Sequence, residues 1–91
     1  MTESSFFDNI PKESIIFVKN WLLISERITA ILEAKNWNLA LFAEALGKEE
    51  EEVDRWLNSP YNFSLKTLAS IEAVLEESVL YIPESDENSE S

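Results

Sequence analysis

The chain has 91 residues, of which 45% are hydrophobic and 11% aromatic, so it is long enough for one compact core and too short for two. It carries 18 acidic against 7 basic side chains, a formal net charge of −11, which opposes non-specific attraction to nucleic acid or to anionic membrane. It has no cysteine, no histidine and one glycine, so disulfides, thiolate metal sites, histidine-dependent catalysis and glycine-rich phosphate loops are excluded, and we expect a binding module without cofactor or metal rather than an enzyme.

The N-terminal residues are expected to form a loose arm, residues 1–11, that ends at Pro11. The first four residues are acidic rather than basic, which is atypical of a signal peptide. The most apolar stretch, residues 15–24, is too short to span a bilayer and contains Lys19. We therefore expect a cytoplasmic protein.

A long first helix is predicted over residues 12–35. Its apolar side chains recur at steps of four, three, four and three, which is the period of one helical face. These side chains are Phe17, Trp21, Ile24, Ile28 and Ile31.

Two short helices are predicted next, joined by a turn at the single glycine. Asn38 is a good N-cap for a helix over residues 39–46, and Gly47 fits the left-handed position that follows it. A third helix is predicted from near Glu50 to the turn residues 58–60.

The C-terminal third is predicted to hold a helix, a strand and a tail. Ser64 caps a fourth helix that runs from residue 65 to about residue 76. Residues 78–82 are β-branched and aromatic, which favours a short strand, but a lone strand needs a partner such as the same strand of a second chain. Residues 83–91 are acidic and serine-rich, and we expect a disordered tail.

Three local patterns resemble the Xre-like, lambda-repressor-like helix-turn-helix family, and among its members the small HigA-type antitoxins. They are Leu-Ala-Leu-Phe-Ala-Glu-Ala-Leu-Gly at 39–47, Val-Asp-Arg-Trp-Leu-Asn at 53–58 and Asn-Phe-Ser-Leu-Lys-Thr-Leu at 62–68. The resemblance implies an all-α fold of four to five helices over residues 12–82, with the motif at about 38–58 and a short C-terminal strand used in dimerisation. It also implies a DNA-binding transcriptional regulator, antitoxin-like in type.

The third helix of this family enters the major groove, where side-chain donors read the bases and the phosphates are held nearby. The family's contact positions map here onto residues at the start of the second helix, in the third helix and in the loop after it. They are Asn38, Lys48, Glu50, Glu51, Arg55, Asn58, Tyr61 and Asn62.

The expected recognition helix is acidic, which favours an alternative function. Residues 48–58 contain two basic and five acidic side chains, a net charge of −3, and like charges about 4 Å apart in water repel by roughly 1 kcal/mol. The alternative is a protein-interaction module on the same fold, which binds a basic protein such as a toxin and has weak or no affinity for DNA. The same acids also suit the positive end of a helix dipole, so a plain solvated helix start explains them as well.

The first helix indicates a homodimer, because eight of the ten residues over 15–24 are apolar and a surface helix needs only one apolar stripe. The other open interpretation is that the N-terminal arm, with Phe6, Phe7 and Ile10, folds back over it. The side chains expected in the dimer interface are Phe17, Trp21, Leu22, Val79 and Tyr81.

Overall fold

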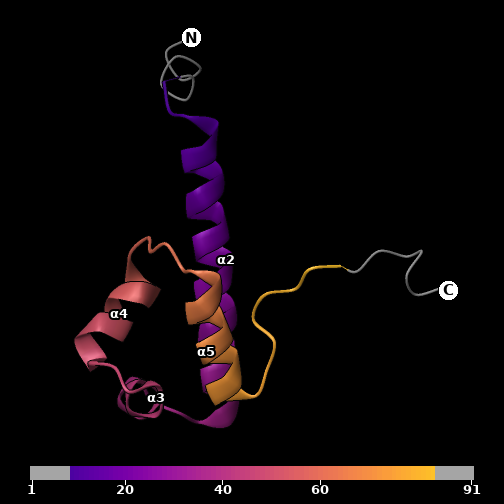
Figure 1. Ribbon diagram of the computed structural model, residues 1–91. Coiled ribbons are helices and arrows are strands. Elements are labelled where there is room, and N and C mark those ends of the chain that lie inside the picture. The colour runs from indigo at the N-terminus through magenta and orange to yellow at the C-terminus, as the bar shows by residue number, and fades with distance from the viewer. Residues whose placement is uncertain (1–8, 84–91) are drawn as a thin grey trace, which may run out of the picture.

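The structure is a computed structural model that describes residues 9–83, and within that range it is all-helical. Its helices are α2 (Lys12–Lys35), α3 (Leu39–Leu46), α4 (Glu50–Asn58) and α5 (Leu65–Leu75). In Figure 1, α2 is a single long rod, while α3, α4 and α5 gather around its C-terminal half. The predicted arm and tail fall outside the described residues, apart from 9–11 and 83.

The helix α2 runs unbroken for 24 residues, which corresponds to about 36 Å. It contains neither glycine nor proline, the two residues that most disfavour a helix interior. Glu13 in its first turn and Lys35 in its last turn both interact favourably with the helix dipole. It ends where Asn36 takes the left-handed conformation, with φ of 61°. The bounds predicted from the periodicity of the sequence are confirmed.

Local capping residues fix the ends of the shorter helices. The side chain of Asn38 accepts a hydrogen bond from the Leu41 amide, and that of Ser64 accepts one from the Thr67 amide. Gly47 has φ of 71° at the end of α3, which a residue with a Cβ adopts only under strain. The predictions for these three capping residues are confirmed.

One core joins all four helices. α4 contacts α2 and α3, and α3 contacts α5. Phe42, Val53 and Ile71 are among the side chains that are fully buried. The full set of buried hydrophobic residues in this core is Ile28, Ile31, Leu32, Phe42, Ala43, Val53, Trp56, Ile71 and Leu75.

Residues 78–82 form no strand in the single chain, and the strand expected on dimerisation stays a prediction. The amides of Val79 and Leu80 donate instead to one carboxylate oxygen of Glu72, at 2.7 and 2.9 Å. Arg27 Nε donates to the carbonyl of Ser78 at 3.0 Å. The segment lacks a partner strand to complete a ladder, so its backbone groups are taken by side chains of α5 and α2.

Among residues 9–83, no helix is both long enough and apolar enough to cross a membrane.

Candidate functional site

The turn between α3 and α4, together with α4 itself, carries five of the eight expected DNA-contact residues. The amide of Gly47 donates to the Glu44 carbonyl and that of Lys48 to the Ala43 carbonyl, both at 3.0 Å. This pair of hydrogen bonds is the Schellman motif, and it fixes the path of the chain as it leaves α3. The start of α4 is therefore held rigidly against the end of α3.

One face of α4 is buried and the opposite face is open to solvent. Val53 and Trp56 are buried at 0% and 3% exposure. Successive residues are about 100° apart on a helix, so the positions that do not face the core lie together on the opposite, solvent-exposed face. That exposed face consists of Glu50, Glu51, Asp54, Arg55 and Asn58.

The exposed face of α4 is acidic and has few side chains in position to donate to a ligand. Glu50, Glu51 and Asp54 carry the acids, and Arg55 is its only base among the described residues. The Asn58 amide nitrogen donates to the carbonyl and the carboxylate of Asp54, at 3.0 and 2.8 Å. Arg55 is thus the exposed cation best placed on this face to contact a phosphate.

The expected contact residues divide into three groups. Lys48, Glu50, Glu51 and Arg55 are exposed at the turn and on α4. Asn38 and Asn58 are exposed but use their side chains in local hydrogen bonds, to Leu41 and to Asp54. Tyr61 and Asn62 lie in the loop beyond α4, beside a groove that borders α2.

An aromatic cluster holds the loop after α4. Tyr61 stacks on Trp56 with ring centroids 5.3 Å apart and planes at 21°, and Phe63 meets Tyr61 edge-on at 4.9 Å. The Tyr61 ring is therefore engaged in packing over α4. Such aromatic pairs add about 0.5–1.5 kcal/mol beyond the area that they bury.

The last turn of α4 is tied to α2 by a tryptophan. Trp21 Nε1 donates to the Trp56 carbonyl at 2.7 Å. The usual helical partner of that carbonyl is the amide of residue 60, but Pro60 has no N–H. The indole thus satisfies a carbonyl at the helix end, and Trp21 belongs at least in part to the fold of its own chain.

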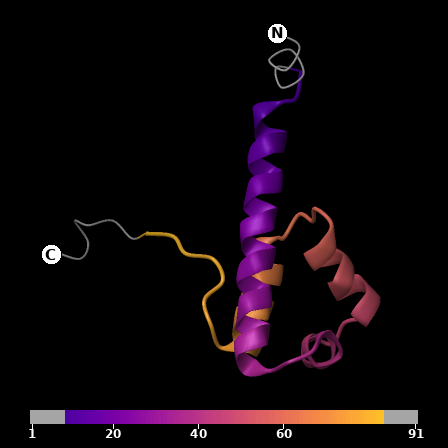
Figure 2. The same cartoon turned by 180° about the vertical axis from the view of Figure 1, so that it is seen from behind.

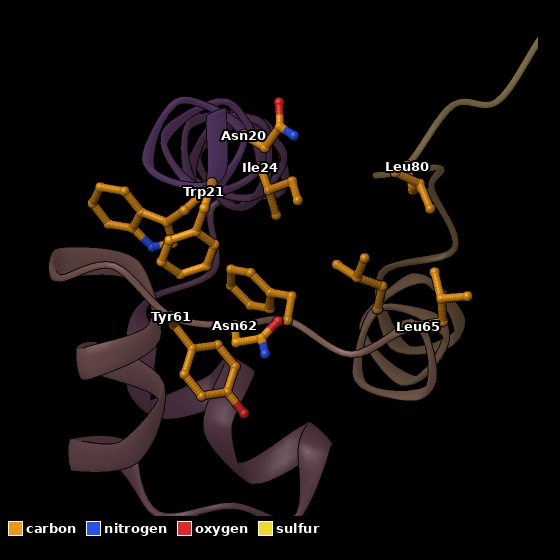
Figure 3. Close-up of a pocket in the computed structure, with 10 residues that line it drawn as sticks. Asn20, Trp21, Ile24, Tyr61, Asn62, Leu65 and Leu80 are labelled. Carbon is orange, nitrogen blue, oxygen red and sulfur yellow. The ribbon is translucent and has the colours of Figure 1, made fainter. Parts of the chain in front are cut away.

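An apolar groove runs between α2 and the C-terminal part of the chain. Figure 3 shows Trp21 and Ile24 of α2 on one side, Tyr61 below them, and Leu65 with Leu80 on the other side. This cavity has a volume of about 260 Å³, and a neighbouring one of about 310 Å³ shares Ile24 and Leu80 with it. Both are lined mainly by apolar side chains and neither holds a cluster of acids.

The side chains expected in a dimer interface differ widely in exposure. Phe17, Leu22 and Tyr81 are 39%, 45% and 79% exposed. Trp21 and Val79 are half-buried, the first against α4 and the second against the core. Within residues 9–83, the first three are the exposed members of this set.

One side chain that organises this region, Glu72, is not among the site residues expected from the sequence. Glu72 accepts the amides of Leu80 and Val79, and these two bonds lower the pKa of its carboxyl below the ordinary value. A carboxylate near the C-terminal end of a helix opposes the helix dipole, and this unfavourable placement was the only hint of a second role.

Within residues 9–83, no group of three or more acidic side chains is arranged to hold a metal ion. No known protein family, curated protein or solved structure matches this chain.

Proposed function

We propose that this chain is a DNA-binding transcriptional regulator of the lambda-repressor-like helix-turn-helix type, in which α4 is the recognition helix. The observation that carries the proposal is the unit of α3, the Gly47 turn and α4. A capped short helix braces a second helix whose outer face is open along its whole length. In such motifs the second helix lies in the major groove and its N-terminal residues meet the base edges.

Three features define the DNA contacts in this proposal. The N-terminus of α4 supplies unpaired backbone amides and the positive end of the helix dipole to a phosphate. Lys48 lies just before this terminus, and Arg55 lies on the open face of the helix. Glu50 and Glu51 accept from cytosine amino groups, which is the base contact open to a carboxylate.

The acids set the strength of this binding. Lys48 and Arg55 stand against five acids between residues 49 and 54, so attraction to phosphate is weak and specific contacts must supply most of the affinity. We therefore expect a regulator with low non-specific affinity for DNA, whose affinity falls with salt in proportion to the few phosphate contacts that it makes.

The second candidate function is a protein-interaction module whose partner is a basic protein such as a toxin. The exposed Glu50, Glu51 and Asp54 favour it, because they form an acidic face on a rigid helix. Opposite charges on the two proteins would speed their encounter, and the rate would fall with added salt.

A titration distinguishes these functions. The chain is added to a labelled duplex taken from the region upstream of its own gene, at about 50 mM and about 200 mM salt, and anisotropy is followed. A regulator binds this duplex at the lower salt more tightly than it binds a scrambled duplex, and it loses affinity at the higher salt. Absence of binding at 50 mM salt overturns the regulator and leaves the interaction module.

Variants on the open face of α4 sharpen this test. Arg55→Ala should weaken DNA binding about tenfold, since it removes one charged contact. The double change Glu50→Gln and Glu51→Gln should strengthen non-specific binding several-fold, because two repulsive charges disappear next to the phosphates. The matched control is Glu33→Gln with Glu77→Gln, which makes the same charge change on exposed residues outside α3 and α4. Equal effects of both pairs would show that net charge, and not this face, governs binding.

A further inference from the structure

Among residues 9–83, the N-terminal half of α2 extends beyond the other helices, and Figures 1 and 2 show it without a neighbouring helix on either side. Its outer face, opposite the core, is symmetric about Lys19. Ile15 and Ile16 stand four and three positions before this lysine, and Leu22 and Leu23 stand three and four positions after it. These four apolar side chains are 44%, 55%, 45% and 54% exposed, in chain order.

The charges on the same face continue the symmetry with opposite signs. Lys12 stands seven positions before Lys19, and Glu26 stands seven positions after it. Both are exposed, and seven positions correspond to two helical turns, so both lie on the face of Lys19.

A face with this pattern is complementary to itself when two copies meet in opposite directions. Under a two-fold axis at Lys19, each residue faces the position equally far on the other side of the centre. Ile16 then packs on the partner's Leu22, and Ile15 on the partner's Leu23. Lys12 of each chain lies beside the partner's Glu26, which gives two ion pairs at the ends of the contact.

We propose that this chain forms an antiparallel homodimer through the outer face of the N-terminal half of α2, centred on Lys19. Residues 12–24 carry two basic side chains and one acidic one, whereas the whole chain carries −11. Two copies therefore meet through a segment that is not acidic. The same four side chains that are half-exposed in the single chain are covered in the pair.

Lys19 is the exception to the apolar pattern, and its position on the axis limits the strength of the dimer. Its alkyl chain packs along the seam while the ammonium groups of the two copies turn out to water. They repel each other weakly in that setting. Replacement by leucine removes this repulsion, and Lys19→Leu should tighten the dimer at least tenfold.

Two other covers for this face make different predictions. If the N-terminal arm covers it, the chain stays a monomer at every concentration. If an unrelated protein covers it, the isolated chain is also a monomer and the charge pattern about Lys19 has no effect on association.

Sedimentation equilibrium of the full chain tests the proposal. The wild type should show a dimer mass at micromolar to hundred-micromolar concentration, and Ile16→Glu with Leu23→Glu should show a monomer mass. Ala34→Glu is the control, since it adds one acid to an exposed position of α2 beyond the proposed contact. Circular dichroism confirms that each variant is folded. A monomeric wild type, or an unchanged dimer in the double variant, overturns the proposal.

A charge exchange tests the antiparallel direction. Lys12→Glu and Glu26→Lys should each weaken the dimer several-fold, and the chain with both changes should recover wild-type affinity because the pairs form again with signs reversed. Additive weakening in the double variant would contradict this direction.

Crosslinking gives a second test of direction, since the chain has no cysteine of its own. With a short bifunctional maleimide, Lys19→Cys should crosslink to itself. Lys12→Cys and Glu26→Cys should crosslink only when the two variants are mixed. Self-crosslinking at all three positions would indicate parallel helices and overturn the proposed pairing. None of these outcomes depends on DNA, so the dimer and the proposed function fail separately.

Discussion

The two halves of α2 are similar in apolar content and opposite in environment. The C-terminal half places Ile28, Ile31 and Leu32 in the core, at 0%, 5% and 7% exposure. The N-terminal half leaves Ile16 and Leu23 more than half exposed. The difference lies in the neighbours, because α3, α4 and α5 gather only around the C-terminal half (Figure 2). An apolar helix face thus indicates that a surface needs cover, while the fold decides whether the same chain supplies it.

The largest effect is expected from truncation in the covered half. Ile28→Ala should lower the free energy of unfolding by about 3 kcal/mol, because it removes buried methyl groups and leaves a cavity. The matched change Ile16→Ala is made in a chain that carries Leu23→Glu, which keeps it monomeric. In that background it should change the free energy of unfolding by less than about 0.5 kcal/mol. Urea denaturation followed by circular dichroism measures both. Similar losses at the two positions would contradict the contrast between the halves.

A smaller effect is expected at the boundary between the halves. Trp21→Phe keeps an aromatic ring but removes the N–H that the Trp56 carbonyl accepts, so stability should fall by about 1 kcal/mol. Trp37→Phe, at another half-buried tryptophan, controls for the loss of ring area. If the two variants unfold at the same urea concentration, the hydrogen bond to α4 contributes nothing measurable.

The smallest effect is expected from Glu72, whose bonds to the segment after α5 border the exposed half of α2. Its pKa is lowered because the ionised carboxylate accepts the amides of Leu80 and Val79. The stabilisation is therefore complete above the ordinary pKa of 4.5 and is lost as the pH falls through the lowered value.

Amide resonances measure this pH dependence at individual residues. Those of Val79 and Leu80 should shift together on acidification in the wild type. In Glu72→Gln the shift should disappear, with a loss of stability of about 0.5 kcal/mol at neutral pH. An unchanged acid shift in Glu72→Gln would show that another carboxylate is responsible.

Most helix ends were predictable because short-range chemistry sets them. Asn38, Gly47 and Ser64 each have a side chain, or lack one, that suits a single capping position, and each takes that position. The exposed face of α4 follows from the helical period once Val53 and Trp56 are assigned to the core.

The features that the sequence did not reveal depend on contacts between distant residues. The strand propensity of residues 78–82 says nothing of a pairing partner, and in the single chain Glu72 takes two of the amides that a strand would use. The bond from Trp21 to Trp56 spans 35 positions, and only the packing of α2 on α4 brings the two together. The symmetry about Lys19 was present in the sequence, but it acquires a meaning only when the structure shows that these side chains are half-exposed among the described residues.

Because α2 is continuous, it fixes the distance and the orientation between the partner bound to its N-terminal half and the core that holds α4. No glycine, proline or break separates the two halves, so they cannot turn independently. One residue inserted between them would rotate the outer face by about 100° and move it by about 1.5 Å relative to the core. In a dimer paired through this helix, the distance and the rotational phase between the two α4 helices would then be set by a residue count. An insertion of seven residues would nearly restore the phase while it lengthens the spacing.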